Sequence, residues 1–340
     1  MKRLTLMALA LATSFTATSS FAKNSLNVIC STDSEWCKLM ETAFEKETGI
    51  DVALVRKSSG EAFAQIRAEK RNPKIDIWWG GTGDPHLQAA AENLTQSYTA
   101  DNSKGLLDWA NRQATQADNK TVGIYAGALG IGYNANILKQ KGLPAPVCWK
   151  DLANPIYKGE IQVANPNSSG TAYTALATVV QLFGEEEGFN YLTQLHSNIN
   201  QYTKSGSAPI KAAARGETTI GITFMHDMIK QVKKGFPIKV VAPCEGTGYE
   251  VGSMSIIKGA RNLANAKQWA EFALRPDIQS MAVKAKSYQV PSNASAVVPA
   301  EAPKLSDVKL IDYDFATYGS SDVRKRLLKR WDTDVKSLPR

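Results

Sequence analysis

Short apolar runs alternate along the chain with segments whose apolar residues recur every three or four positions. In residues 34–48, Trp36, Met40 and Phe44 share one face of a predicted helix that Gly49 ends. The first apolar runs predict strands at residues 26–30, 50–55 and 75–79. The helices that follow them are predicted at residues 34–48, at 61–69 and from Pro85 onward. Three consecutive strand–loop–helix units predict an α/β layer with parallel strands.

A second series of the same kind follows a glycine-rich β segment at residues 122–134, which we interpret as a crossing between two lobes. Its strands are predicted at residues 160–164, 219–224 and 238–242. Its helices are predicted at residues 171–183, 210–215 and 228–234. Residues 251–257 predict a return crossing, and the last helices are predicted at residues 262–274 and 323–329.

The chain has 340 residues, which is more than one hydrophobic core usually serves. We therefore predict an α/β fold of two lobes with a cleft between them. Lobe 1 is expected to comprise residues 23–126 and 252–300. Lobe 2 is expected to comprise residues 127–251 and 301–340.

The first 22 residues have the pattern of a secretory signal peptide. Lys2 and Arg3 precede a largely apolar run at residues 4–11, and a small-x-small motif at residues 20–22 predicts cleavage after Ala22. Polar residues from Thr13 onward make the apolar run too short to span a membrane. The remaining chain is therefore expected to be exported.

Export gives the four cysteines an oxidising environment, so two disulfides are expected. Three pairings are possible for Cys30, Cys37, Cys148 and Cys244. We favour Cys30–Cys37, which would tie the end of a strand to the first turn of the next helix, and this leaves Cys148–Cys244. A zinc site is disfavoured because the chain has no CxxC pair and only three histidines.

Composition narrows the class of protein. With 43% hydrophobic and 21% charged residues, the chain is neither disordered nor of low complexity. The net charge of +8 is spread along the sequence without a basic stripe interleaved with aromatic residues, so no nucleic-acid partner is expected. The main basic cluster, residues 324–330, is interpreted as a solvated helix face.

Four loops that follow predicted strands share a small, hydroxyl-bearing or glycine-rich composition. Serine and threonine are also ordinary N-caps, so one such loop would carry little weight. Each loop leads into a helix N-terminus, where unpaired N–H groups attract anions, and all four should face one cleft. Together they predict an anion site built without lysine. The loops are Ser31-Thr32, Ser58-Ser59-Gly60, Gly80-Gly81-Thr82 and Asn167-Ser168-Ser169-Gly170-Thr171.

Polar and aromatic residues at equivalent positions could recognise the rest of a ligand. His226 and Asp227 follow the strand at residues 219–224 and could bind hydroxyl groups, and Glu250 on the return crossing could do the same. Their alternative roles are an N-cap for Asp227 and a solvated edge charge for Glu250. Of Trp78 and Trp79, one is expected in the core and the other against a sugar ring.

Catalytic motifs are lacking. The chain has no G-x-S-x-G elbow, no H-E-x-x-H helix and no phosphate-binding P-loop. We therefore expect neither an enzyme nor a bound cofactor. A secreted hydrolase with His226 and Asp227 as an acid–base pair is the least supported alternative, because nothing in the sequence supplies a nucleophile. His86 and His196 are interpreted as structural.

Three segments resemble the extracellular solute-binding proteins of ABC importers. They are WWGGTGDP at residues 78–85, ANPNSSGTAYT at residues 164–174 and IDYDFA at residues 311–316. The most similar branch is often labelled ferric-iron-binding, and it also includes binders of sugar phosphates, phosphoglycerate and aminoethylphosphonate. The resemblance covers essentially the whole chain after residue 22. It implies a type II periplasmic-binding-protein fold, with two lobes joined by two β crossings that close on a ligand. It also implies a periplasmic monomer that docks transiently on an inner-membrane ABC permease.

The resemblance also bears on the ligand. Iron-binding members carry adjacent tyrosines in the second lobe, whereas this chain has 11 tyrosines, no Tyr-Tyr pair, and Met225-His226-Asp227 in that place. This is similar to the hexose-phosphate-binding subgroup, which implies a small phosphorylated sugar as ligand. It implies that the phosphate is held by Ser31, Thr32, Ser58, Thr82, Ser169, Gly170 and Thr171. It implies that sugar hydroxyls are held by His226, Asp227 and Glu250.

Two alternative ligands remain at this stage. One is 2-aminoethylphosphonate or another organophosphate, whose amine would pair with the carboxylates. The other is Fe(III), held by His226, Asp227, Glu250 and scattered tyrosines.

Overall fold

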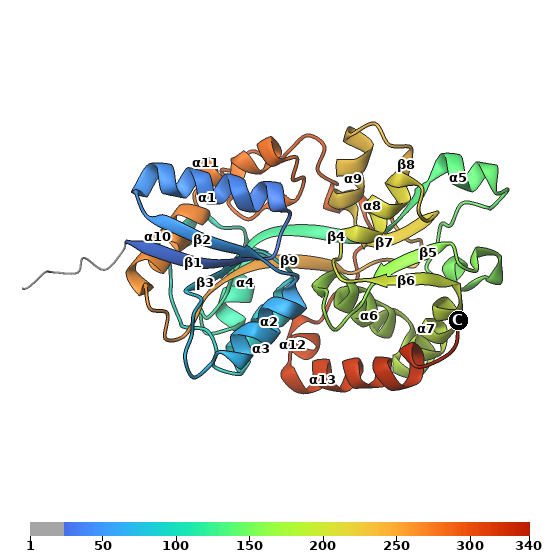
Figure 1. Cartoon of the computed structure of the whole chain (residues 1–340), viewed down its shortest axis with the longest axis horizontal. Helices are drawn as coiled ribbons and strands as arrows, with labels where there is room; N and C mark the ends of the chain where they lie inside the picture. Colours follow the sequence, from blue (N-terminus) through green and yellow to red (C-terminus); the bar gives the residue numbers. More distant parts are fainter. Residues whose placement is uncertain (1–23) are drawn as a thin grey trace, which may run out of the picture.

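Two strands in the middle of the molecule connect its two halves (Figure 1). The computed structural model describes residues 24–340; the expected signal peptide and its cleavage site lie outside the described residues. The strands are β1 (Ser25–Cys30), β2 (Asp51–Arg56), β3 (Ile77–Trp79), β4 (Val122–Asn134), β5 (Ile161–Ala164), β6 (Ile199–Thr203), β7 (Ile220–Phe224), β8 (Ile238–Val241), β9 (Tyr249–Ile256) and β10 (Val290–Pro291).

Helices flank these strands on both sides. They are α1 (Ser34–Thr48), α2 (Ser59–Ala68), α3 (Gly83–Ala91), α4 (Asp108–Gln116), α5 (Ala135–Gln140), α6 (Gly170–Phe183), α7 (Glu185–Asn198), α8 (Ala208–Arg215), α9 (Met225–Lys233), α10 (Leu263–Ala273), α11 (Pro276–Gln279), α12 (Phe315–Tyr318) and α13 (Ser321–Arg330). Among the residues that the structure describes, no helix is both long enough and apolar enough to cross a membrane.

Strand β4 belongs to both halves. The strand order is β2-β1-β3-β9-β4-β7-β5-β6, with β8 and β10 also pairing with β4. Strands β1, β2 and β3 pair in parallel in the first half, and β5, β6 and β7 do so in the second. The first part of β4 pairs antiparallel with β9, and its last part, from Leu129 to Tyr133, pairs antiparallel with β7. The predicted α/β fold with two β crossings is confirmed.

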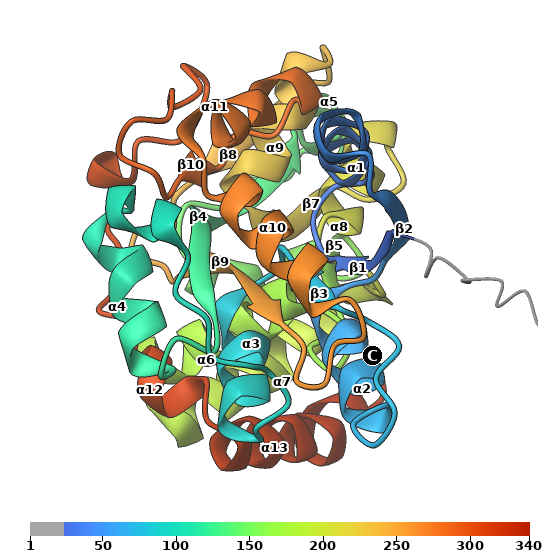
Figure 2. The same cartoon turned by 90° about the vertical axis from the view of Figure 1, so that its left-hand side faces the viewer.

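In each half, separate hydrophobic clusters pack on the two faces of the strands. In the first half, alternate residues of β1 point to opposite faces: Val28 packs with α1 and α10, whereas Ile29 packs with α2 and α3. Figure 2 shows these two pairs of helices on opposite sides of the strands. In the second half, α6 and α7 pack on one core, and α8 and α9 on another. The C-terminal residues Leu327 and Trp331 join the core of the second half. The exact lobe boundaries stay a prediction.

Several helices begin earlier than the sequence predicts, among them α2, α3 and α9. The expected starts were Glu61, Pro85 and Met228, but α2 begins at Ser59, α3 at Gly83 and α9 at Met225. In each case the preceding residue has an extended backbone and acts as the N-cap. As a result, His226 and Asp227 lie in the first turn of α9, and Asp227 is not its N-cap.

Helices α4 and α7 and strand β6 were not predicted at all. Their apolar positions are sparse in the sequence, and only tertiary packing identifies them.

Two disulfides are present, Cys30–Cys37 and Cys148–Cys244, which is the pairing that the sequence favours. The first joins the end of β1 to the first turn of α1. The second joins residues that are 96 positions apart in the sequence.

The interpretation of residues 324–330 as a solvated face is wrong for Arg324. Its side chain is buried, with the guanidinium carbon 3.9 Å from the ring centre of Tyr173, and its charge acts on the buried Asp84 of α3. The neighbouring Arg326 and Arg330 remain at the surface, where they pair with Glu185.

The two halves touch each other along both rims of the cleft. Backbone N of Gly60 donates to backbone O of Ser168 at 3.0 Å. At the other rim, Lys230 Nζ of α9 lies 2.8 Å from Asp33 Oδ2 and 3.1 Å from Glu35 Oε2. Lys230 is only 2% exposed, so this ion pair is buried when the halves meet. The structure is therefore a closed arrangement.

Replacing Lys230 should favour the open arrangement. Removing one partner of a buried ion pair costs about 3–5 kcal/mol because the other charge stays buried, and opening the cleft would return Asp33 to water. In the absence of ligand, Lys230→Ala should therefore give a larger radius of gyration by small-angle X-ray scattering. Lys38→Ala, which breaks a Lys–Glu pair within α1, is the control. Identical scattering from Lys230→Ala and the wild type would show that this ion pair does not govern closure.

Candidate functional site

Six helix N-termini converge on one pocket between the two halves. The N-cap residues are Asp33 for α1, Ser58 for α2, Thr82 for α3, Ser169 for α6, Ser207 for α8 and Phe224 for α9. All of them line one pocket, whose empty volume, including the solvent space at its mouth, is about 470 Å³. Because unpaired N–H groups and positive helix-dipole ends point inward from both halves, the pocket favours an anion.

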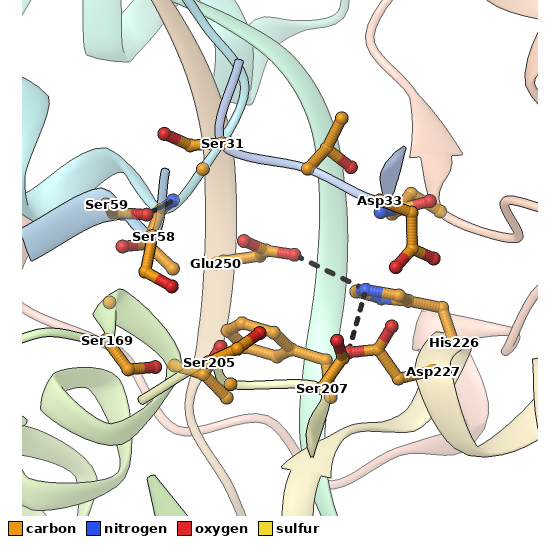
Figure 3. Close-up of a pocket in the computed structure, with 18 of the residues that line it drawn as sticks. Ser31, Asp33, Ser58, Ser59, Ser169, Ser205, Ser207, His226, Asp227 and Glu250 are labelled. Carbon is orange, nitrogen blue, oxygen red and sulfur yellow. Dashed lines mark hydrogen bonds and ion pairs between the residues drawn. The ribbon is translucent and has the colours of Figure 1, made fainter. Parts of the chain in front are cut away.

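The ten ligand-binding residues predicted from the sequence all line this pocket. They are Ser31, Thr32, Ser58, Thr82, Ser169, Gly170, Thr171, His226, Asp227 and Glu250. Figure 3 shows Ser31, Ser58, Ser59 and Ser169 on the left of the pocket, Ser205 and Ser207 along its lower side, His226 and Asp227 on the right, and Glu250 between them. We call the region lined by the serines the hydroxyl end and the region around His226 the charged end. The charged end comprises Asp33, His226, Asp227 and Glu250.

Several lining residues were missed. Ser205, Gly206 and Ser207 precede α8 and repeat the composition of the four predicted loops. They were overlooked because the strand before them, β6, was not predicted. Asp33, Arg56, Tyr125 and Gln289 carry no comparable local signal, since only the fold brings them to the pocket. Ser59 belongs to the predicted loop Ser58-Ser59-Gly60, although it was not among the ten residues.

Serine hydroxyls at the hydroxyl end accept hydrogen bonds from surrounding N–H groups. Ser31 Oγ accepts from Nε1 of Trp78 at 2.8 Å. Ser59 Oγ accepts from backbone N of Thr82 at 3.2 Å, and Ser169 Oγ accepts from a backbone N of α6 at 3.3 Å. Each bond occupies an oxygen lone pair and leaves the hydroxyl proton available for donation. The surrounding N–H groups thus leave these hydroxyls free to act as hydrogen-bond donors toward the pocket.

Gly170 permits a close approach of the two halves at this end. A Cβ on Gly170 would collide with Oγ1 of Thr82, which belongs to the opposite half. That Oγ1 is buried and has no hydrogen-bond partner among the described residues. A buried hydroxyl without a partner is costly, so this atom is suited to contact a bound ligand.

One cation lies at the rim of the hydroxyl end. Arg56 Nε donates to backbone O of Thr32 at 3.1 Å, and its Nη2 donates to Ser205 Oγ at 3.3 Å. Arg56 is exposed, so its charge adds to the positive potential at the rim without being buried beneath a ligand.

His226 is the centre of the charged end. Its Nε2 lies 3.8 Å from Glu250 Oε1 and 3.9 Å from Asp227 Oδ2, and its ring packs against β4 at Gly127, where a side chain would collide with Nδ1. Burial lowers the pKa of His226 to about 4, so the imidazole is neutral at neutral pH and can donate or accept a hydrogen bond.

The carboxylates around His226 differ in their electrostatic environment. Burial, followed by the charge of Asp33, raises the pKa of Asp227 to about 7. Burial, followed by the charges of Asp227 and Asp84, raises the pKa of Glu250 well above its ordinary value. Burial alone would also raise the pKa of Asp33, but Lys230 and Lys211 lower it. Asp33 is thus the ionised member, because it has its own counter-ions.

Neither tryptophan faces a sugar-binding surface, so that expectation is wrong. Trp78 and Trp79 are 0% and 2% exposed. Trp78 stacks on His86 with ring centres 3.6 Å apart, and its indole N–H positions Ser31. His86 contacts Ser255 Oγ and backbone O of Gly80, in keeping with its predicted structural role.

The charged end does not form a compact set of metal ligands. In the described part of the chain, the one group of at least three His, Cys, Asp or Glu side chains close enough to share an ion is Cys148, Cys244 and Glu245. Its two cysteines form a disulfide. The side chains of His226, Asp227 and Glu250, expected as ligands under the Fe(III) alternative, form no such group.

Comparison with known proteins identifies relatives of this chain in both sequence and structure. The chain is similar to the periplasmic binding protein AfuA from Actinobacillus pleuropneumoniae, solved with exogenous fructose 6-phosphate bound, with a TM-score of 0.90 and 45% identity over 93% of this chain and 100% of that one. It is 44% identical to an uncharacterized protein of Haemophilus influenzae, over 93% of this chain and 92% of that protein. It is 26% identical to a putative 2-aminoethylphosphonate-binding periplasmic protein of Salmonella typhimurium, over 73% of this chain and 72% of that protein.

A family model adds an independent assignment. The model for bacterial extracellular solute-binding proteins matches residues 72–317, which include both crossings and most of the pocket. The fold, the cleft between two halves and the similarity over nearly the whole chain agree with this match. The chain therefore belongs to the bacterial extracellular solute-binding proteins, the periplasmic binding components of ABC transporters.

Proposed function

We propose that this protein captures a hexose phosphate in the periplasm, closes its two lobes around it and delivers it to an ABC permease in the inner membrane. The observation that carries this proposal is the set of hydroxyl donors in the pocket. Ser31 and Ser59 of one half face Ser169 of the other, and each accepts a hydrogen bond from the surrounding structure while its own proton remains available.

The hydroxyl end suits a phosphate group. A phosphate presents several oxygen acceptors, and short hydroxyl side chains with helix N-termini can surround it from both halves. The predicted phosphate ligands Ser31, Thr32, Ser58, Thr82, Ser169, Gly170 and Thr171 are therefore proposed for this role, with Ser59, Ser205 and Ser207 added.

The charged end suits the hydroxyl groups of a sugar. His226, Asp227 and Glu250 are buried and could each accept or donate hydrogen bonds to a polyol. Inorganic phosphate would leave these groups unpaired, so the site should discriminate against it. AfuA, which is 45% identical to this chain, was solved with fructose 6-phosphate bound, and this supports a sugar phosphate here.

Closure follows from the division of donors between the halves. A ligand bound to one lobe alone has only part of its hydrogen bonds, so it favours the closed state by its extra affinity for that state. We propose that the lobes, residues 23–126 with 252–300 and residues 127–251 with 301–340, move about β4 and β9. The protein is proposed to act as a monomer after cleavage at Ala22.

We propose binding rather than catalysis. Among the described residues, His226 Nε2 faces two carboxylates and not a serine hydroxyl, so no activated nucleophile is formed. A second candidate ligand is 2-aminoethylphosphonate. The Salmonella typhimurium relative and the carboxylates of the charged end, which could pair with an amine, favour it.

A thermal-shift panel tests the ligand class. Glucose 6-phosphate and fructose 6-phosphate should each raise the melting temperature, since a ligand at about 100 times its dissociation constant stabilises a fold by about 2.7 kcal/mol. Inorganic phosphate should give a much smaller shift. Equal shifts with phosphate and sugar phosphate would contradict the role of the charged end. A shift with 2-aminoethylphosphonate alone would favour the second candidate, and a shift with ferric citrate alone would favour iron.

Gly170→Ala should block closure without harming the fold. Gly170 begins α6, where alanine is favourable, but the new methyl group would collide with Thr82 of the other half only when the cleft is closed. Affinity for the sugar phosphate, measured by calorimetry, should fall about 10- to 100-fold, while the melting temperature of the unliganded protein stays the same or rises. Glu187→Ala, at an exposed position of α7 in the same half, is the control. Unchanged affinity in Gly170→Ala would argue against a ligand held between the closed halves.

Substitutions at the two ends should have different effects. Ser169→Asp should abolish binding of both phosphate and sugar phosphate, because it places a negative charge beside the anion. His226→Ala should weaken sugar phosphate binding by about tenfold while changing phosphate binding little. Calorimetric titration of each variant with both ligands measures this. The opposite ranking would show that the two ends of the ligand are assigned the wrong way round.

A further inference from the structure

The charged end of the pocket contains more carboxylates than cations. Asp33, Asp227 and Glu250 lie in this region, and Glu35, outside the pocket, shares Lys230 with Asp33. Lys230 and Lys211 are the only two ammonium groups among residues 24–340 that act on these carboxylates. His226 does not supply a third positive charge, because burial keeps it neutral. The excess of acidic groups needs an explanation in a pocket that otherwise favours an anion.

Both lysines pair with acidic residues on one side of this region, Asp33 and Glu35. Lys230 Nζ lies 2.8 Å from Asp33 and 3.1 Å from Glu35, and Lys211 Nζ lies 3.5 Å from Asp33. In the described chain, no lysine or arginine nitrogen lies within ion-pair distance of Asp227 or Glu250. These two residues are 8% and 4% exposed, so their carboxyl groups are largely removed from bulk water, which makes a charge without a counter-ion costly there.

Asp227, Glu250 and the neighbouring His226 also form fewer hydrogen bonds than their polar atoms allow. Asp227 Oδ2 accepts one hydrogen bond, from Thr223 Oγ1 at 3.2 Å. The 3.8 and 3.9 Å distances from His226 Nε2 to Glu250 and Asp227 are too long for hydrogen bonds. His226 Nδ1 is buried and has no hydrogen-bond partner among the described residues. The charged end is therefore prepared for a polar group that the protein itself does not provide.

We propose that this end selects an ammonium group, so that the preferred ligands are amino-sugar phosphates, and that their binding expels a proton from the Asp227–Glu250 pair. This inference rests on the proposed function, because it takes the hydroxyl end as the phosphate site. The ammonium group would supply the missing counter-ion. The proton leaves a carboxyl O–H for the buffer, and the resulting carboxylate pairs with the ligand cation. A sugar phosphate without an ammonium group would instead bind to the protonated pair and expel no proton from it.

The electrostatic surroundings of the two carboxyl groups agree with this coupling. Asp227 is faced by Asp33 from the β1–α1 loop, by Lys211 of α8, by Lys230 and His226 of α9, and by Glu250 of β9.

Glu250 is faced by Asp227 and His226 of α9, by Asp84 of α3 and by the buried Tyr125 of β4. Burial, followed by the charge of Asp33, holds the pKa of Asp227 at about 7, so this group carries a proton below neutral pH and loses it above. The preference for a cationic ligand should therefore increase as the pH rises through 7, because there is less proton to expel.

Isothermal titration calorimetry with three matched ligands tests the proposal on the wild-type protein. Glucosamine 6-phosphate, glucose 6-phosphate and 2-deoxyglucose 6-phosphate differ only in an ammonium, a hydroxyl or a hydrogen at one carbon. At pH 6.5, glucosamine 6-phosphate should bind about tenfold more tightly than glucose 6-phosphate, since each unit by which a ligand lowers a carboxyl pKa adds a factor of ten to its affinity. Titration in buffers of different ionisation heat should show release of up to about one more proton with the amino sugar than with the other two, because proton exchange at the phosphate is common to all three ligands.

A pH series and two variants sharpen the test. The affinity ratio of amino sugar to glucose 6-phosphate should rise between about pH 5.5 and 7.5, and the ionisation of the phosphate itself cancels because all three ligands share it. Asp227→Asn and Glu250→Gln should each bring the ratio toward one and remove the additional proton release, whatever their effect on glucose 6-phosphate. Glu41→Gln, which removes a negative charge on α1 away from the pocket, should keep both.

Two different results would overturn the inference. If glucose 6-phosphate binds but the amino sugar binds no more tightly at any pH, or expels no additional proton, the ammonium site is wrong and the proposed function stands. If none of the three ligands binds, the proposed function fails and this inference fails with it.

Discussion

The pocket depends on hydrogen-bond donors that come from both halves of the molecule. The helix N-termini of one half reach the pocket from one side only, so neither half alone encloses a ligand. Each half presents three N-termini, and β4 carries the chain from one set to the other as a single strand of 13 residues. The position of the cleft and the requirement for closure follow from this division.

The two ends of the pocket illustrate two ways to stabilise polar groups out of water. At the hydroxyl end, neutral groups are fixed by bonds from neighbours such as Trp78, so little charge is buried. At the charged end, Asp33 is compensated across the cleft by Lys230, whereas no lysine or arginine of residues 24–340 forms an ion pair with Asp227 or Glu250. The pocket therefore combines helix N-termini that favour an anion with a buried acidic pair that favours a cation or a hydrogen-bond donor.

Local composition and the family resemblance together were enough to predict most of the fold and ten residues that line the pocket, because helix N-termini after strands have a recognisable pattern. The pattern failed where the strand itself was not recognisable. Residues 199–203 alternate apolar and polar side chains only weakly, so β6 was missed, and Ser205 to Ser207 were missed with it. Tyr125 and Arg324 could not have been placed from the sequence, since a buried tyrosine in a strand and a buried arginine in a basic helix depend on distant contacts.

The disulfide between Cys30 and Cys37 has a consequence for the loop that it encloses. Ser31, Thr32 and Asp33 all lie inside this small ring, whose ends are 7 positions apart. A closed ring has far fewer conformations than an open loop, so much of the entropy cost of ordering these residues is met when the sulfurs join and not when the ligand arrives. The order of this loop therefore depends on whether Cys30 and Cys37 are oxidised. The reduced protein would hold the hydroxyl groups of Ser31 and Thr32 more loosely than the oxidised protein.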